Sequence, residues 1–220
     1  MDFGGSASKE ILTRNMELSS CNVEEVQQFT YLGSIVSTDG GTEEDVKSRL
    51  GKARVAFHML DNLWKSKVIS RHTKLKISNS NVKSVLLYGS ETWRTTKQIH
   101  CKIQVFVGNC LRRIFNINWK DNITNKELWN MAEQDSMETT ITRRKWTWIG
   151  HTMRKAGSSI TKKALSWTPQ SCRDRGRPKN TWKRTVEKEL GSMKLSWSEA
   201  ESKAQDRACL LYTSPSPRDS

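Results

Sequence analysis

The stretch RRKWTWIGHTMRK, residues 143–155, places two tryptophans and a histidine among five basic residues, with no acid. Cations bind phosphates and flat rings stack on bases, so this composition is typical of a surface that grips a nucleic-acid strand. On a helix, the spacing sets Arg144, Trp148, His151 and Lys155 on one face. The nucleic-acid-binding residues predicted here are Arg143, Arg144, Lys145, Trp148, His151, Arg154 and Lys155.

A second interpretation places the tryptophans in a helix core and makes the charges its solvated rim. Trp146 lies on the face opposite Trp148, which predicts that Trp146 packs inward. Upstream, Met137 and Ile141 extend the face of Trp148 and favour core packing for that ring too. Gly150 is a candidate for an early helix end. The sequence leaves both roles open for Trp148.

A second basic segment, CRDRGRPKNTWKR at residues 172–184, has six basic residues against one acid, Asp174. Its core, Arg-Gly-Arg-Pro at 175–178, has the pattern of an AT-hook, in which arginines lie along the narrow minor groove of A·T-rich DNA. An extended phosphate-binding arm and a solvated linker are the alternatives, and Trp182 is expected to attach the segment to the body. The binding residues predicted here are Arg173, Arg175, Gly176, Arg177, Lys179, Lys183 and Arg184.

The composition of the whole chain agrees with a polyanionic partner. Among 220 residues, 37 are basic and 23 acidic, which gives a net charge of +14; the pI is about 9.8. Such an excess favours nucleic acid, with a surface that serves only solubility as the alternative. Nine tryptophans indicate packed apolar patches in spite of a mean hydropathy of -0.70.

Several classes of protein are excluded by what the sequence lacks. No apolar run approaches the about 18 residues of a membrane helix, and the N-terminus lacks a signal-peptide pattern. We therefore expect a cytoplasmic or nuclear protein that is not secreted and does not bind membranes. The five cysteines form no Cys-x-x-Cys pair and the four histidines complete no zinc pattern, so we expect no metal and no cofactor.

The predicted fold is mainly α: a short β hairpin, then a helical bundle and a basic helical or extended C-terminal region. Val46, Leu50, Ala53, Phe57 and Trp64 recur at helical spacing after the candidate N-cap Thr42. A further helix is expected over residues 71–88, with Gly89 as its stop, and another over residues 97–116. A short helix should follow the Thr124–Glu127 capping box, and a last one should begin after Ser136. The predicted units are a loose lead-in (1–24), a β element (25–40), a helical domain (41–155), a basic linker (156–181), a helical segment (182–209) and an adapter-like tail (210–220).

Four strings occur in order along the chain: FTYLGSIVSTDG, LLYGSETW, RRKWTWIGH and RGRPKNTWK. In this order and spacing they resemble the C-terminal part of the endonuclease–reverse transcriptase of non-LTR (LINE-type) retrotransposons, in the RTE-like group. The resemblance covers residues 24–209. It implies a thumb-like helical domain, and a primer-grip-like hairpin at Phe29, Tyr31, Leu32 and Gly33. The alternative for the two rings is an ordinary hydrophobic strand face.

The same resemblance implies that the polymerase palm and the endonuclease are absent. That palm carries adjacent metal-binding aspartates, and this chain contains no Asp-Asp pair. We therefore expect no enzymatic activity and no small-molecule substrate. The predicted partner is RNA or an RNA–DNA duplex, with A·T-rich DNA as an alternative partner, and a non-functional relic as the third hypothesis.

Overall fold

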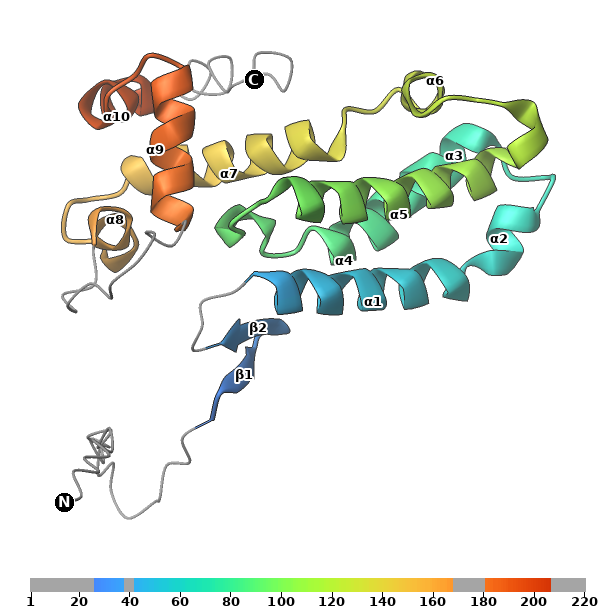
Figure 1. The fold of residues 1–220 in the computed structure, drawn as a ribbon, viewed down its shortest axis with the longest axis horizontal. Helices are drawn as coiled ribbons and strands as arrows, with labels where there is room; N and C mark the ends of the chain where they lie inside the picture. The colour runs from blue at the N-terminus through green and yellow to red at the C-terminus, as the bar shows by residue number, and fades with distance from the viewer. Residues whose placement is uncertain (1–25, 38–41, 168–180, 207–220) are drawn as a thin grey trace, which may run out of the picture.

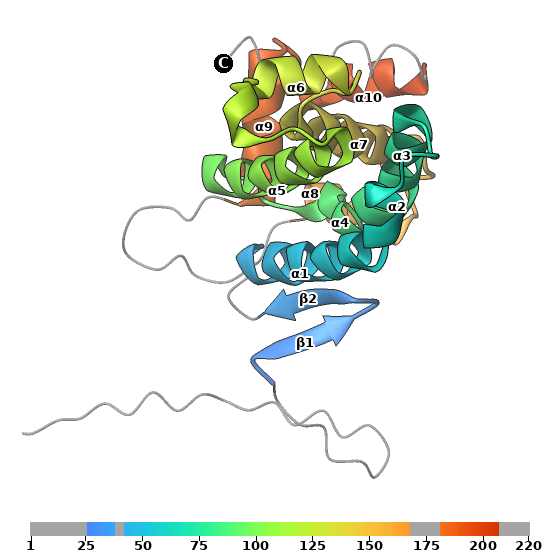
Figure 2. The same ribbon diagram turned by 90° about the vertical axis from the view of Figure 1, so that its right-hand side faces the viewer.

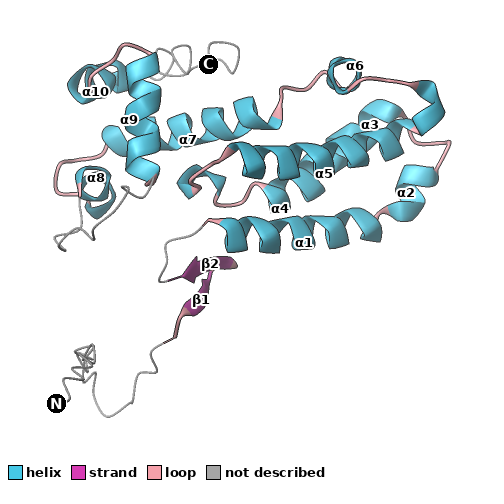
Figure 3. Ribbon diagram, in the orientation of Figure 1, coloured by secondary structure: helices cyan, strands magenta, loops and turns pink. Residues whose placement is uncertain are grey.

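The computed structural model describes residues 26–37, 42–167 and 181–206. The architecture is mainly α behind one two-stranded hairpin, which confirms the predicted fold class (Figures 1 and 3). The strands are β1 (Gln28–Tyr31) and β2 (Ser34–Ser37). The α-helices are α1 (Glu43–Met59), α2 (Asp61–Lys65), α3 (Arg71–Ile77), α4 (Ser84–Leu86), α5 (Lys97–Phe115), α6 (Asn125–Met131), α7 (Met137–Met153), α8 (Ile160–Ser166), α9 (Trp182–Ser192) and α10 (Trp197–Gln205). Shorter turns are the π-helix η1 (Ser78–Lys83) and the 3-10 helices η2 (Ser90–Thr92) and η3 (Trp119–Asp121).

The hairpin turns at Leu32 and Gly33, where β1 and β2 pair antiparallel with Tyr31 opposite Ser34. Both turn residues have positive φ, 49° and 80°, as a two-residue type I′ turn requires. Gly33 adopts this conformation without strain, whereas Leu32 does so at a cost. The Asp-Gly-Gly stretch that sequence reasoning placed at the end of this element, residues 39–41, lies outside the described residues. Figure 2 shows the hairpin against α1.

The first core lies among α1, α4, α5, α6 and the N-terminal part of α7. The apolar residues predicted to share one face of α1 are buried, and α1 packs on α4, η1 and α5. Thr42 precedes α1 as predicted, but its hydroxyl accepts from the backbone N of Arg94 at 3.1 Å and makes no cap hydrogen bond. We call the described residues from 42 to 141 the first body.

The helix predicted over residues 71–88 contains a π-helical turn in its middle. Polar side chains in the run Ser78-Asn79-Ser80-Asn81 compete for backbone groups there: Asn81 Nδ2 donates to Ile77 O at 3.1 Å, and Ser84 Oγ donates to Ser80 O at 2.5 Å. Such local bonds loosen the regular α-helical ladder. The helix ends as expected, before Gly89 at φ 74°.

The second core joins the C-terminal half of α7 to α8, α9 and α10. Its buried residues are Trp146, Ile149, Met153, Leu165, Val186, Leu190, Ala200 and Ala204. Gly150 does not end α7, which continues to Met153. Residues 156–181 were predicted to be a linker, but they contain helix α8. Burial of Leu165 in this core holds that helix against the other three. We call the described residues from 145 to 206 the second body; α7 runs from one body into the other (Figure 1).

Candidate nucleic-acid interface

The outer face of the hairpin is apolar and exposed. Phe29 is 57% exposed and Tyr31 61%, and their ring centroids lie 6.5 Å apart on the same face of β1. Val36, the partner of Phe29 on β2, is 58% exposed. Leu32, at the tip, is 72% exposed. The residues predicted to be primer-grip-like therefore form a strip of rings and branched chains at the surface.

A buried carboxylate attaches this hairpin to the helices. Asp45 of α1, 6% exposed, accepts from the backbone N of Ile35 at 3.0 Å through Oδ1. Its Oδ2 accepts from Nε1 of Trp93 at 2.8 Å. One side chain therefore ties β2, α1 and the segment after α4 together.

Two cations of α1 complete the attachment. Arg49 Nη2 donates to Ser34 Oγ at 2.9 Å, and its guanidinium lies 4.4 Å from the ring centroid of Tyr88. Lys52 Nζ donates to Gly33 O at 2.9 Å. A buried polar group without partners costs free energy, so these bonds hold the hairpin in one place relative to α1.

Sequence reasoning missed both Asp45 and Arg49 as functional supports. Neither residue was among the predicted site residues. The available signal was their position: both lie beside the apolar residues Val46 and Leu50 on the face that becomes buried. A charged residue in an apolar stripe indicates a buried polar network.

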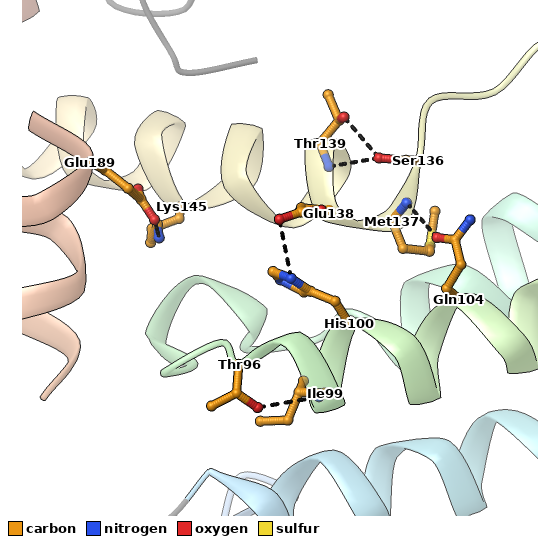
Figure 4. Close-up of polar contacts among 10 residues, drawn as sticks. All are labelled: Thr96, Ile99, His100, Gln104, Ser136, Met137, Glu138, Thr139, Lys145 and Glu189. Carbon is orange, nitrogen blue, oxygen red and sulfur yellow. Dashed lines mark hydrogen bonds and ion pairs between the residues drawn. The ribbon is translucent and has the colours of Figure 1, made fainter. Parts of the chain in front are cut away.

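The structure corrects the prediction for Lys145. Its side chain is 2% exposed and forms an ion pair with Glu189 of α9 (Figure 4). Glu189 also accepts from Trp146 Nε1 at 2.8 Å. A phosphate cannot reach this ammonium group while α9 covers it. Trp146, 1% exposed, packs inward as predicted.

Two arginines of the same stretch also have carboxylate partners within the protein. Arg143 Nη1 lies 2.7 Å from Asp135 Oδ2. Arg144 donates twice to Glu91 Oε1, at 3.0 and 2.8 Å. In contrast to Lys145, both retain surface exposure, 54% for the side chain of Arg143 and 41% for that of Arg144. A phosphate can reach these two, in competition with the carboxylates.

Trp148 lies half-buried against the second core. Its ring meets that of Trp182 edge to face at a centroid distance of 6.0 Å. Trp182 Nε1 donates to Glu91 O at 3.0 Å, so this ring attaches the start of α9 to the first body. These contacts match the core interpretation of Trp148.

The C-terminal end of α7 carries the remaining predicted residues of this stretch. Arg154 is half-buried, and its Nη1 donates to Ala204 O at 2.8 Å. His151 and Lys155 are exposed; Lys155 Nζ lies 3.3 Å from Thr161 Oγ1. His151, Lys155 and the partly exposed Arg143 and Arg144 are therefore the positions of this stretch that a ligand can reach.

The second basic segment is described only in part. Lys183 Nζ donates to Ser166 O at 3.2 Å, and Arg184 is exposed. The other predicted residues lie outside the described residues: Arg173, Arg175, Gly176, Arg177 and Lys179.

A titratable contact that sequence reasoning did not foresee lies between α5 and α7 (Figure 4). His100 Nδ1 lies 3.4 Å from Glu138 Oε1, and its Nε2 is buried without a partner. Burial lowers the pKa of His100 below its ordinary value; Glu138 opposes this effect, Lys145 adds to it, and Glu189 opposes it.

The described residues also bear on metal sites and membrane spans. In residues 26–37, 42–167 and 181–206, no three His, Cys, Asp or Glu side chains are grouped closely enough to hold a metal ion. In the same ranges, no helix is both long and apolar enough to cross a membrane.

The chain is similar to a transposon-derived protein. Over 177 residues it is 22% identical to F52C9.6, an uncharacterized transposon-derived protein of Caenorhabditis elegans. The match covers 78% of this chain and 63% of the length of that protein. Residues 56–88, from the later part of α1 to the end of α4, match a domain of unknown function (DUF6451). No solved structure matches the chain.

Proposed function

We propose that this chain is a nucleic-acid-binding part of a transposon-encoded reverse transcriptase, and that it holds a template RNA–primer duplex. Its likeness to a transposon-derived protein supports the transposon origin. The four ordered sequence strings support the narrower assignment to the primer-grip and thumb region of a LINE-type enzyme.

The observation that carries the proposal is the hairpin. Phe29, Tyr31 and Val36 are exposed, although Asp45 and Arg49 hold the hairpin firmly against α1. An apolar strip on a fixed support is typical of an interaction surface, because exposure of such a strip to water is unfavourable. Rings in this setting can pack against the sugars and bases at the end of a primer.

The charge of the chain supports a polyanionic ligand. A net charge of +14 gives long-range attraction to phosphates. Each phosphate neutralised on binding lowers the logarithm of affinity by about 0.7 to 0.9 per tenfold rise in salt. The proposal assigns binding and no chemistry to the chain, whose sequence contains no Asp-Asp pair.

The test is binding of an RNA–DNA duplex with a recessed primer end, measured by filter retention over a series of salt concentrations. We expect a steep salt dependence and at least about tenfold weaker binding by the double variant Phe29→Ala, Tyr31→Ala. The control variant is Trp119→Ala, which removes an 84% exposed ring from η3, outside the hairpin; its affinity should stay unchanged.

Four outcomes would contradict the proposal. A flat salt response would mean that phosphates are not the ligand, and equal losses in the hairpin and control variants would remove the hairpin from the interface. Extension of the primer in the presence of magnesium and nucleotides would show that the chain is an enzyme. Preference for A·T-rich duplex DNA, abolished by Arg175→Ala with Arg177→Ala, would favour the AT-hook hypothesis instead.

A further inference from the structure

A pocket of about 380 Å³ opens between the helices of the second body. Met153 of α7, Leu165 of α8 and Trp197 of α10 form its apolar wall. Lys162, Lys183 and Glu201 bring charges to the same pocket. Its volume falls in the range of small-ligand sites and suits one flat ring system with an attached sugar.

The polar side of this pocket is cationic on balance. Lys162 Nζ lies 2.5 Å from Glu201 Oε1, which leaves the second lysine without an acidic partner among the lining residues. Lys183 Nζ donates to Ser166 O at 3.2 Å and so lies at the C-terminal end of α8. An anionic ligand is favoured at this position.

Trp197 supplies the surface for a flat ligand. Its side chain is half-buried, packs on the second core and lines the pocket. A ring fixed in this way loses little conformational entropy when a second ring stacks on it. Every nucleobase has such a flat face, and stacking therefore does not depend on base identity.

We propose that this pocket receives one unpaired base of a single-stranded nucleic acid, stacked on Trp197, with a neighbouring phosphate at Lys183. The inference rests on the proposed function for the kind of ligand, but it assigns a separate surface to a separate form of that ligand. A base inside a duplex is already stacked and cannot enter a pocket. The hairpin then contacts duplex, and the second body contacts single strand.

The test uses the full chain and a fluorescent ten-nucleotide oligo-uridine RNA, with binding measured by anisotropy. We expect Trp197→Ala to weaken binding about tenfold or more, Trp197→Phe to retain most of it, and Trp119→Ala to leave it unchanged. Circular dichroism of each variant checks that the second body remains folded. The same oligonucleotide made with abasic sites should bind the unaltered protein as weakly as the natural one binds Trp197→Ala.

A second measurement does not depend on the folding of a variant. Oligo-uridine containing 4-thiouridine is crosslinked to the unaltered protein by light, and the modified peptides are found by mass spectrometry. We expect crosslinks in the peptides that contain Met153, Leu165 or Trp197. Crosslinks confined to other peptides would overturn the inference.

The outcomes separate this inference from the proposed function. Equal affinity for natural and abasic single strands would overturn the pocket, while hairpin-dependent binding of the duplex would still stand. Tight single-strand binding that depends on Trp197, with no effect of Phe29→Ala and Tyr31→Ala on duplex binding, would support the pocket and overturn the hairpin. Absence of binding to either form would overturn both.

Discussion

The two bodies each hold a buried tryptophan on a carboxylate. In the first body, Trp93 donates to Asp45 at 2.8 Å; in the second, Trp146 donates to Glu189 at 2.8 Å. Both rings are 1% exposed. In each case the carboxylate also fixes a second element: Asp45 binds the hairpin, and Glu189 binds α9 to α7.

The difference lies in how much apolar core surrounds each of these contacts. Among the residues that the structure describes, the first core has 22 buried residues and the second has eight. A small core contributes little stabilisation, so polar contacts account for a larger share of the stability of the second body. Half-buried rings extend this core at its edge, among them Trp148, Trp182 and Trp197.

This difference explains the composition of residues 143–155. Tryptophans among cations suit a nucleic-acid surface, and they suit equally a small body that is attached to a larger one through rings and ion pairs. Lys145 and Arg144 attach α7 to elements of the two bodies, through ion pairs with Glu189 and Glu91 respectively. His151 and Lys155 are exposed near the C-terminal end of α7, where a nucleic acid can still reach them.

The largest expected effect follows from removing the carboxylate of the second body. Glu189→Ala leaves Lys145 buried without its ion pair, a change that costs about 3–5 kcal/mol. We expect the second body to unfold before the first, seen as two transitions in thermal melting. The matched control is Glu187→Ala, which removes an exposed glutamate from the same helix and should leave one transition. Equal melting curves for the two variants would show that the second body does not depend on the ion pair between Lys145 and Glu189.

A pH titration tests the half-buried Lys83 of the first body, whose partner differs from that of Lys145 in the second. Lys83 of the first body donates to the amide of Gln134 at 2.8 Å, whereas Lys145 binds a carboxylate. Burial lowers the pKa of Lys83 to about 8, against a smaller opposing effect of Asp135. Between pH 8 and 10.5 the unfolded chain holds a proton that the folded chain lacks, so stability rises with pH in this window.

The expected rise in the free energy of unfolding is about 3 kcal/mol across that window, relative to Lys83→Met. The measurement is urea denaturation at a series of pH values for both proteins. The difference between the two curves isolates Lys83 from the other groups that titrate at alkaline pH. Parallel curves would show that Lys83 stays protonated in the folded protein between pH 8 and 10.5.

Removing the carboxylate of the first body should have a more local effect. Asp45→Ala leaves the donors of Ile35 and Trp93 unsatisfied and removes the carboxylate that lies 3.9 Å from Nε of the buried Arg49, at a cost of about 3 kcal/mol. The larger core keeps the helices folded, and the hairpin becomes loose. Hydrogen exchange of the Ile35 amide should accelerate, while that of α5 amides stays slow. Glu44→Ala, an exposed change in the same turn, is the control.

The smallest effect concerns the approach of the hairpin to Gly89. Gly89 has φ 74°, and an added Cβ would lie 3.3 Å from Ser34 Oγ, so Gly89→Ala should destabilise by about 1–2 kcal/mol. Gly51 lies inside α1 with nothing within 4 Å of an added Cβ. Gly51→Ala should therefore stabilise by about 0.5–1 kcal/mol. Urea denaturation of both variants measures the change in the free energy of unfolding. A change of the same sign in both variants would contradict the different backbone conformations assigned to Gly89 and Gly51.

Much of the helical structure follows from local signals. The spacing of Val46, Leu50 and Phe57 predicts the buried face of α1, and the Thr124–Glu127 capping box is present at the start of α6. Ser136 accepts from the backbone N of Thr139, at the predicted start of α7. These features depend on residues within about two helical turns of one another, so they can be recognised without the fold.

The sequence by itself determined the helices, the apolar faces and the strong positive charge of this protein. Only the tertiary structure decided which cations remain accessible, because the partners of Lys145 and Arg144 lie 44 and 53 residues away in the chain. It also decided that the rings of the hairpin face solvent while Trp148 packs against a core. Spacing gives the relative direction of side chains on one element, but the element packed against that face determines whether a ring meets water, a carboxylate or another ring.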